Sequence, residues 1–216
     1  MSKSTNLFFA EVLDKQRLEI LPYLAPFKDL HFYLAGGTAL ALLLWHRKSV
    51  DFDFFTPNQI DTQQLFQLCQ KIFSDFTVKK IFEEENTLYI TVNGVKISFI
   101  TYEYPHVEAC IETPYLSLAS IEDIGTMKLS AIQNRSTNKD YVDLYVTIKK
   151  IWLQRLLEVF FQKFGDVVSD SYLLKALIYF DDIKEEPLLI NDSTLTFDTV
   201  KTWLEQAVKD LKLHHH

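Results

Sequence analysis

Two glycines and two aspartates near the start of the chain form a pattern that could carry out chemistry. Gly36 and Gly37 are adjacent, and the alternating pair Asp51 and Asp53 follows a short distance later. Glycine lacks a Cβ, so a turn built from it lets the backbone come close to a phosphate. Carboxylates two residues apart in an extended run leave the same face of a strand. Because Mg²⁺ is commonly held by one or two carboxylates plus substrate phosphates, the pattern predicts metal-assisted nucleotide transfer.

Three elements must position these four residues. A short strand over His31–Ala35 is predicted to enter the glycine turn, and Thr38–Trp45 is predicted to be a helix whose N-terminus favours anions. Ser49–Phe55 is predicted to be the strand that carries both aspartates. The other face of that strand is expected to point toward a core through alternate apolar residues, namely Val50, Phe52 and Phe54.

Each half of the pattern also has a simple structural explanation. A Gly-Gly pair between a strand and a helix is often only a tight turn. An Asp-x-Asp on a strand is often only a solvated face. The order of strand, glycine turn, helix and carboxylate strand favours the functional interpretation, because the chemistry requires the elements in that order.

A longer motif surrounds these residues and consists of Leu34-Ala35-Gly36-Gly37-Thr38-Ala39-Leu40 followed by His46-Arg47-x-Ser49-x-Asp51-x-Asp53-x-Phe55. It resembles the DNA polymerase β-like nucleotidyltransferase superfamily. Within that superfamily it is similar to the AbiEii/AbiGii toxin family, the toxin half of bacterial toxin–antitoxin and abortive-infection systems. A second segment resembles another sequence block of the family and consists of Lys128-Leu129-x-Ala131-x-x-x-x-Arg135-x-x-x-Lys139-Asp140-x-x-Asp143-Leu144. The two blocks together span Phe32 to Leu144.

The resemblance implies roles for the residues of the first block. In such enzymes two Mg²⁺ ions, with Mn²⁺ as an alternative ion, clamp a triphosphate during in-line displacement at the α-phosphorus. The expected metal ligands are Asp51 and Asp53. The expected contacts to the β- and γ-phosphates of the NTP are Gly36, Gly37 and Thr38. Arg47 is expected either to contact phosphate or to pair with Asp51 and orient it.

The second block supplies further charges. Lys128 and Arg135 are seven residues apart, which would place both on one helical face, and both are expected to bind phosphate. The resemblance implies that Lys128 offsets the charge of the triphosphate. Asp140 and Asp143 are expected to be additional acids. The expected catalytic set is therefore Asp51, Asp53, Lys128, Asp140 and Asp143.

The residues of the second block have structural alternatives that stay open. Thr137-x-x-Asp140 matches a capping box, in which the acid at the third helical position closes the start of a helix. Lys139 and Asp143 match an ordinary i,i+4 pair on a helix surface. Either arrangement would explain these residues without any role in catalysis.

One position departs from the superfamily pattern. Such enzymes usually place a third carboxylate, a metal ligand and base, on a strand after the Asp-x-Asp strand. Here the expected strand is Val95–Tyr102, and the expected position is Ser98. A serine is neither a base at neutral pH nor an anionic metal ligand. Three explanations are open: Asp140 or Asp143 supplies the charge, the acceptor is deprotonated by another route, or catalysis is weak or lost.

The leading hypothesis is a Mg²⁺-dependent toxin that transfers a nucleoside monophosphate from an NTP to RNA. The resemblance implies tRNA 3′ ends as the acceptor of some relatives, and a cognate antitoxin as a partner. One alternative keeps the chemistry and changes the acceptor to a protein or a small molecule. Another alternative, motivated by Ser98, is a catalytically silent NTP-binding module.

Composition limits the class of protein. The net charge of −7 argues against nonspecific nucleic-acid binding over the whole surface, but leaves room for a basic strip from Lys128 to Arg155 or for an ion-paired helical face there. The two cysteines give no disulfide framework and are typical of a reducing cytoplasm, where we expect the protein. No segment approaches the roughly 20 apolar residues needed to span a bilayer, so no membrane partner is predicted.

The pattern of elements predicts an α+β fold in two domains. Residues 1–115 are expected to form a nucleotidyltransferase domain with a small mixed sheet and packed helices, the first helix covering Phe8–Leu24. Within this domain, Asn93-Gly94 predicts a type I′ hairpin. Residues 116–213 are expected to form a helical domain that contributes to the active site. Residues 214–216 are identified as a tag remnant.

Overall fold

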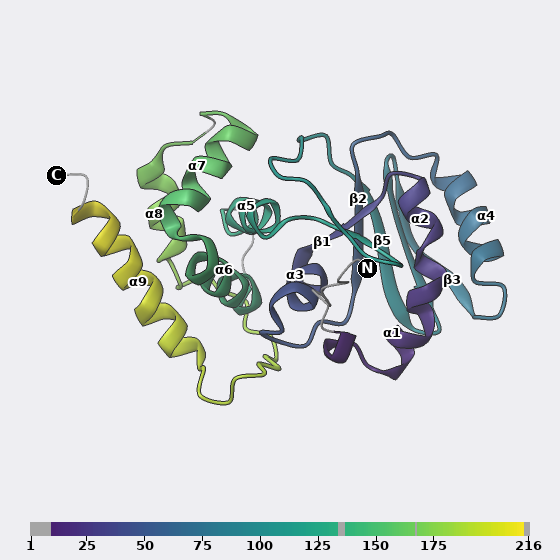
Figure 1. Cartoon of the computed structure of the whole chain (residues 1–216), viewed down its shortest axis with the longest axis horizontal. Coiled ribbons are helices and arrows are strands. Elements are labelled where there is room, and N and C mark those ends of the chain that lie inside the picture. Colours follow the sequence, from purple (N-terminus) through teal and green to yellow (C-terminus); the bar gives the residue numbers. More distant parts are fainter. Residues whose placement is uncertain (1–9, 134–136, 167, 214–216) are drawn as a thin grey trace, which may run out of the picture. The chain divides into compact units, whose positions relative to one another are not determined.

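The chain forms two compact units, seen in a computed structural model that describes residues 10–133, 137–166 and 168–213 (Figure 1). Within the described residues, the first unit runs to Pro105 and includes Ala109–Ala119. The second unit comprises His106–Glu108 and the chain from Ser120 onward. The first unit is a mixed sheet with packed helices and the second is helical, which confirms the predicted α+β class.

The first unit is built on a seven-stranded sheet in the order β3-β4-β5-β2-β1-β7-β6. Its strands are β1 Tyr33–Ala35, β2 Phe52–Thr56, β3 Val78–Glu84, β4 Thr87–Val92, β5 Val95–Thr101, β6 Ile111–Glu112 and β7 Ser117–Leu118. The pairs β2–β5 and β1–β7 are parallel, and the other neighbours are antiparallel. The strand expected to carry the aspartates therefore lies inside the sheet, between β5 and β1.

The predicted hairpin joins β4 to β5. Asn93 and Gly94 have φ angles of 47° and 86°, and left-handed φ at both central residues defines a type I′ turn. The register that follows pairs Val92 with Val95 and Tyr89 with Ser98. The turn therefore fixes which side chains of β4 and β5 share a face.

Short helices precede the sheet, and the single helix predicted over Phe8–Leu24 is wrong. A 3-10 turn over Ala10–Val12 is followed by α1 Lys15–Ile20, a second 3-10 turn over Leu21–Leu24, and α2 Pro26–Asp29. The Asp14 side chain accepts a hydrogen bond from the Arg17 backbone N–H and so starts a new helix. Pro22 then opens the second 3-10 turn. Phe8 and Phe9 lie outside the described residues.

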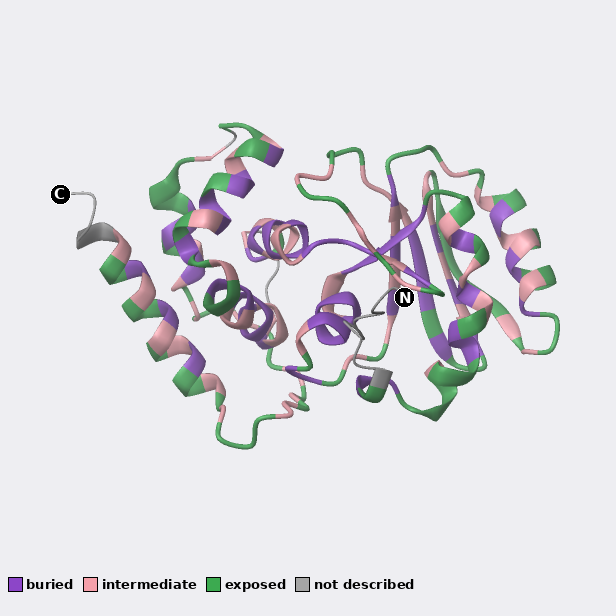
Figure 2. Ribbon diagram, viewed as in Figure 1, coloured by how far each residue is buried: buried purple, intermediate pink, exposed green. Residues whose placement is uncertain are grey.

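One face of the sheet is closed by aromatic packing. Helices α2 and α4, the latter Thr62–Ile72 and capped by Asp61, lie on this face, whereas α3 Gly36–Leu44 lies on the other (Figure 1). Phe54 and Phe99 are stacked with ring centroids 5.5 Å apart, and Phe27 of α2 lies 4.9 Å from Phe99. Buried residues alternate with half-buried ones along β2 and β4, and Figure 2 shows purple, buried stretches within the sheet. Asp53 therefore belongs to the opposite face of the sheet.

The second unit consists of helices around its own apolar core. They are α5 Ile121–Ala131, α6 Asn138–Ile151, α7 Leu153–Phe164, α8 Asp170–Leu177 and α9 Phe197–Leu213. A Cβ at Gly125 of α5 would lie 2.6 Å from Thr147 and 2.9 Å from Leu156, so this glycine permits close packing of α5 on α6 and α7. Gly165 ends α7 with a φ of 69°. Within the described part of the chain, no helix is long and apolar enough to cross a membrane.

Candidate active site

Gly36 and Gly37 directly follow β1 and are the first two residues of α3. Neighbouring side chains come too close to both positions for a larger residue. Gly36 has a left-handed φ of 69°, and a Cβ there would lie 3.2 Å from Asp53 Oδ2. A Cβ at Gly37 would overlap the Arg47 guanidinium and lie 3.3 Å from Ser49 Oγ. The two glycines therefore make room for a carboxylate on one side and for a cation on the other.

Helix α3 starts at Gly36, two residues earlier than predicted, and has no side-chain cap. Its N-cap residue is Ala35, which is extended and has no side-chain oxygen to accept a hydrogen bond from the first turn. The N–H groups of a helix's first turn have no partner within the helix, so they are available to an anion. Trp45 ends α3 with a left-handed φ of 52° and turns the chain toward β2.

The two aspartates differ in their local structure. Asp53 lies within β2, whereas Asp51 comes one residue before the strand begins. Phe52 and Phe54 are buried as predicted. The prediction that Val50 points to the core is wrong: its side chain is 46% exposed, because the pleated strand starts only at Phe52.

Thr38 connects the first turn of α3 to the segment that carries Asp51. Its hydroxyl donates to the Asp51 carbonyl oxygen and lies 2.9 Å from the Ser49 hydroxyl. The Thr38 side chain is buried. Its observed contacts therefore position Asp51, while a contact between Thr38 and phosphate stays a prediction.

Arg47 is buried beside the glycine turn. Its guanidinium packs against Gly37 and donates a 3.1 Å hydrogen bond to the Lys48 carbonyl oxygen. A buried guanidinium keeps its positive charge. It contributes positive potential next to the backbone expected to bind phosphate. Both expected roles of Arg47, phosphate contact and orientation of Asp51, stay predictions.

Ser98 lies directly beside Asp53 in the sheet, at the position where a third carboxylate is usual. The two residues pair in register across β5 and β2, and Ser98 Oγ donates a 2.6 Å hydrogen bond to Asp53 Oδ1. Ser98 is 2% exposed. The Ser98 hydroxyl thus holds Asp53 at Oδ1, while Oδ2 lies over Gly36, where a Cβ would crowd it.

The donor chemistry of this site fits a divalent cation. Asp51 and Asp53 offer hard carboxylate oxygens, which suit Mg²⁺ together with oxygens from a substrate phosphate. No group of three or more His, Cys, Asp or Glu side chains that could hold a metal occurs among the described residues. The assignment of Asp51 and Asp53 as metal ligands stays a prediction, and Ser98 is a hydrogen-bond donor to Asp53.

The second sequence block forms a charged cluster within the second unit. Lys128 Nζ of α5 lies 2.7 Å from Asp140 Oδ1 and 2.8 Å from Asp143 Oδ2 of α6. The exposed fractions of these side chains are 14% for Lys128, 15% for Asp140 and 0% for Asp143. Sequence reasoning grouped these three residues correctly, but one ammonium group between two carboxylates was not predicted. Arg135 lies outside the described residues.

The structural alternatives for this block have different outcomes. Asp140 accepts a 3.0 Å hydrogen bond from the Thr137 backbone N–H, which confirms the capping box. The alternative of an i,i+4 pair between Lys139 and Asp143 is not what the structure shows. Lys139 instead lies 2.8 Å from Glu186, because Asp143 is turned into the core toward Lys128. Asp140 therefore has a structural role whether or not it has a catalytic one.

A buried ion pair in the second unit was missed by sequence reasoning. Lys163 Nζ lies 2.5 Å from Asp123 Oδ1, and both side chains are 1% exposed. Burial tends to raise the pKa of Asp123, but hydrogen bonds from His106, Lys163 and Ser120 outweigh it and hold that pKa well below its usual value. Ser120, three residues before Asp123, is a local capping signal. The partner Lys163 is distant in sequence and leaves no such signal.

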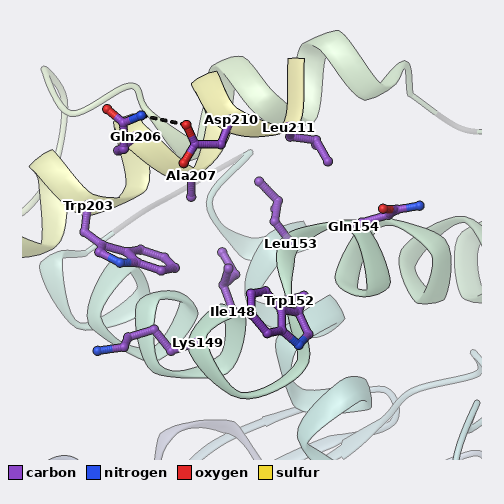
Figure 3. Close-up of a pocket in the computed structure, with 10 residues that line it drawn as sticks. All are labelled: Ile148, Lys149, Trp152, Leu153, Gln154, Trp203, Gln206, Ala207, Asp210 and Leu211. Atoms are coloured by element: carbon purple, nitrogen blue, oxygen red, sulfur yellow. Dashed lines mark hydrogen bonds between the residues drawn. The ribbon is translucent and has the colours of Figure 1, made fainter. Parts of the chain in front are cut away.

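Neither of two prominent cavities contains a predicted site residue. The larger, about 610 Å³, lies in the second unit between α9 and the junction of α6 and α7, where Trp152, Leu153 and Trp203 line it (Figure 3). The smaller, about 390 Å³, lies in the first unit and is lined by residues such as Phe32 and Asn58. We assign the candidate active site by its side-chain chemistry, since cavity size alone names no reaction.

Comparison with known proteins points to the same chemistry. Residues 20–206 match the family model described as nucleotidyl transferase AbiEii toxin, type IV TA system. An uncharacterised protein of Aquifex aeolicus (strain VF5) is 34% identical over 182 residues, which is 83% of this chain and 87% of that protein.

Two solved structures share the fold. MenT4, a nucleotidyltransferase toxin from Mycobacterium tuberculosis H37Rv, has a TM-score of 0.60 at 15% identity, covering 90% of this chain and 82% of its own. A putative nucleotidyltransferase from H. pylori has a TM-score of 0.55 at 18% identity, covering 94% of this chain and 100% of its own. At this level of identity the likeness concerns the fold alone.

Proposed function

Because the chain belongs to the AbiEii family of nucleotidyl transferase toxins, we propose that it transfers a nucleoside monophosphate from an NTP to a hydroxyl of RNA. The supporting observation is the arrangement around Asp53. Its carboxylate accepts a hydrogen bond from Ser98 and faces the cradle formed by Gly36 at the uncapped start of α3. An acid and an anion-binding turn on one side of a sheet suit a metal-bound triphosphate.

The residues of the first unit have defined tasks in this proposal. Asp51 and Asp53 would hold Mg²⁺, which would supply positive charge against the triphosphate. The amides of Gly36 and Gly37 bind the outer phosphates, with the charge of Arg47 behind them. Ser98 orients Asp53 through its hydrogen bond. In the transfer, the RNA oxygen forms a bond to the α-phosphorus, and the bond to the leaving pyrophosphate breaks.

The proton of the attacking hydroxyl needs an acceptor, and Ser98 cannot fill that role at neutral pH. We keep Lys128, Asp140 and Asp143 as proposed catalytic residues on the strength of the second sequence block. Of the two acids, Asp140 is the more accessible and is our choice for the additional carboxylate. Lys128 holds this carboxylate in place.

The family also implies an NTP as substrate and a cognate antitoxin as partner. We propose tRNA as the RNA acceptor and the cytoplasm as the site of action, since NTPs and tRNA meet there. Transfer to a protein or a small molecule is the alternative. In a reaction with an α-labelled NTP, this alternative would put the label on the protein or small molecule and leave RNA unlabelled.

Growth inhibition tests the proposal in cells. Expression of the protein in a bacterial host without antitoxin should arrest growth, and Asp51→Ala or Asp53→Ala should each restore it. Asp75→Ala, at an exposed aspartate of the first unit, is the matched control and should still arrest growth. Circular dichroism must show that the variants fold. A folded double variant that still arrests growth would exclude this site as the source of toxicity.

A further inference from the structure

The face of the sheet that carries Asp53 continues across β5, β4 and β3, and part of it is solvated. Along β4 the buried residues alternate with half-buried ones, Thr87, Tyr89 and Thr91, which point to this face. At the edge strand β3, Phe82 on the same face is 39% exposed. A sheet face that is open on one side of a carboxylate site is accessible to a long substrate.

Strand register places aromatic side chains in one line with Asp53. Asp53 pairs with Ser98, Ser98 with Tyr89, and Tyr89 with Phe82, each on the neighbouring strand. Residues that are directly opposite in a sheet share a face. At about 4.8 Å per strand, Tyr89 lies roughly 10 Å and Phe82 roughly 14 Å from Asp53.

A second line on the same face contains lysines. Lys79 of β3 pairs with Thr91 of β4, which pairs with Lys96 of β5. Both lysines are exposed. Glu84 of β3 also belongs to this face, but it pairs with Thr87 at the far side of the aromatic line. The line from Lys79 through Thr91 to Lys96 therefore carries a cation at each end and no acid between them.

Side-chain contacts confirm that the two lines form one surface. The rings of Phe82 and Tyr89 lie 5.3 Å apart at an angle of 35°. Lys96 Nζ lies 5.1 Å from the centre of the Tyr89 ring, in a cation–π arrangement. Two adjacent rings flanked by cations offer base stacking and phosphate attraction together, which is the chemistry of single-stranded nucleic-acid binding.

Protection of a sheet edge does not explain this surface. Lysines on an edge strand discourage pairing with another chain, and Lys79 of β3 fits that role. Lys96, however, lies on β5, which has neighbours on both sides. An exposed Phe82 on the edge strand would favour unwanted association rather than prevent it.

We propose that this surface, defined by Lys79, Phe82, Tyr89 and Lys96, binds the single-stranded end of the acceptor RNA and leads it toward Asp53. Unpaired bases stack on Phe82 and Tyr89, and backbone phosphates lie at Lys79 and Lys96. The inference rests on the proposed function, because it assumes an RNA acceptor. It adds a binding site that neither sequence block contains.

The test measures RNA binding and transfer separately. The full chain is titrated into a short fluorescein-labelled single-stranded RNA, and the Kd is read by anisotropy at several salt concentrations. Phe82→Ala and Tyr89→Ala should each raise the Kd about fivefold or more, whereas Tyr89→Phe, which keeps the ring, should not. Lys79→Ala and Lys96→Ala should each lower the salt slope by about 0.7. The matched controls are Tyr115→Ala, with the same 39% exposure as Phe82, and the exposed Lys71→Ala.

The outcomes separate this inference from the proposed function. The KM for total tRNA should rise in the Phe82 and Tyr89 variants while the affinity for Mg-NTP stays unchanged. An unchanged Kd for the RNA strand would overturn the inference, as would a loss of NTP affinity instead, since the rings would then hold the base of the NTP. A wild-type protein that binds the strand through this surface yet labels no RNA would contradict the proposed function alone.

Discussion

At the scale of single residues, the site depends on small groups placed against a carboxylate. Gly36 and Ser98 lie on the two sides of Asp53, and neither carries charge. Gly36 leaves space at Oδ2, where a metal or a phosphate would approach. Ser98 satisfies Oδ1 with a short hydrogen bond. The spacing of glycines and aspartates could be predicted from the sequence, but the contact between Gly36 and Asp53 required the register of β1 with β2.

Gly36→Ala should impair both the fold and the activity. The added Cβ would lie 3.2 Å from Asp53 Oδ2 at a left-handed φ, so we expect a loss of about 1–3 kcal/mol of unfolding free energy and a loss of transfer. Gly94→Ala is the matched control, since Gly94 also has a left-handed φ of 86° but nothing within 4 Å of its Cβ position. Urea unfolding and initial transfer rates measure the two effects. Equal loss of transfer in both variants would contradict a specific role for the Gly36 contact.

At the scale of elements, the sequence indicates a helix start where a side chain caps the helix within one turn. The helix starting after Asp61 and the capping box at Thr137 follow from side chains within one turn of the backbone they bond. The first helix was mispredicted because the apolar pattern continues through Asp14, where a side-chain cap restarts the helix. The partner of Asp143 could not be read from its own helix, because it is Lys128 of α5.

Removal of the Lys128 charge should destabilise the second unit. Lys128→Met leaves Asp143 buried without its ion-pair partner from α5, and breaking a buried pair costs about 3–5 kcal/mol. Adding Asp143→Leu to Lys128→Met should recover much of this loss, because the fully buried charge of Asp143 is then removed as well. Asp140, with 15% of its side chain exposed, keeps its hydrogen bonds from Thr137. The free energy of unfolding from urea titrations checks both values. If the losses of unfolding free energy from the two single substitutions simply added in the double variant, the pairing of Lys128 with Asp143 would be contradicted.

At the scale of the whole molecule, the chain combines a sheet unit with a helical unit. The first sequence block lies in the sheet unit and the second lies in the helical unit, and both contain charged residues. The segment His106–Glu108 belongs to the helical unit, although the residues before and after it in the sequence belong to the sheet unit. The backbone N–H groups of Val107 and Glu108 each donate a 3.1 Å hydrogen bond to the Asp123 carboxylate. The sequence could not assign this segment to the helical unit, because the segment is held by the buried Asp123, whose ion-pair partner Lys163 is distant in sequence.

Acid should destabilise the protein through Asp123. Its pKa in the folded state lies below its usual value, so its contribution to stability is complete above the unfolded pKa of about 3.9. That contribution is lost as the pH falls below this value toward the folded pKa. Urea titrations from neutral pH down to about pH 3 should show a smaller fall in unfolding free energy for Asp123→Asn with Lys163→Met than for wild type. Parallel curves for the two proteins would contradict this assignment.

The most direct test of the proposed function is a transfer assay with purified protein. The protein and Mg²⁺ are incubated with total tRNA and each α-labelled NTP in turn, beside the Asp51→Ala/Asp53→Ala variant and a reaction containing EDTA. We predict that label from a preferred NTP enters RNA, and that the variant and the EDTA reaction show none. RNA that stays unlabelled with every NTP, from a protein that binds NTP, would contradict transfer to RNA and favour another acceptor or a silent site.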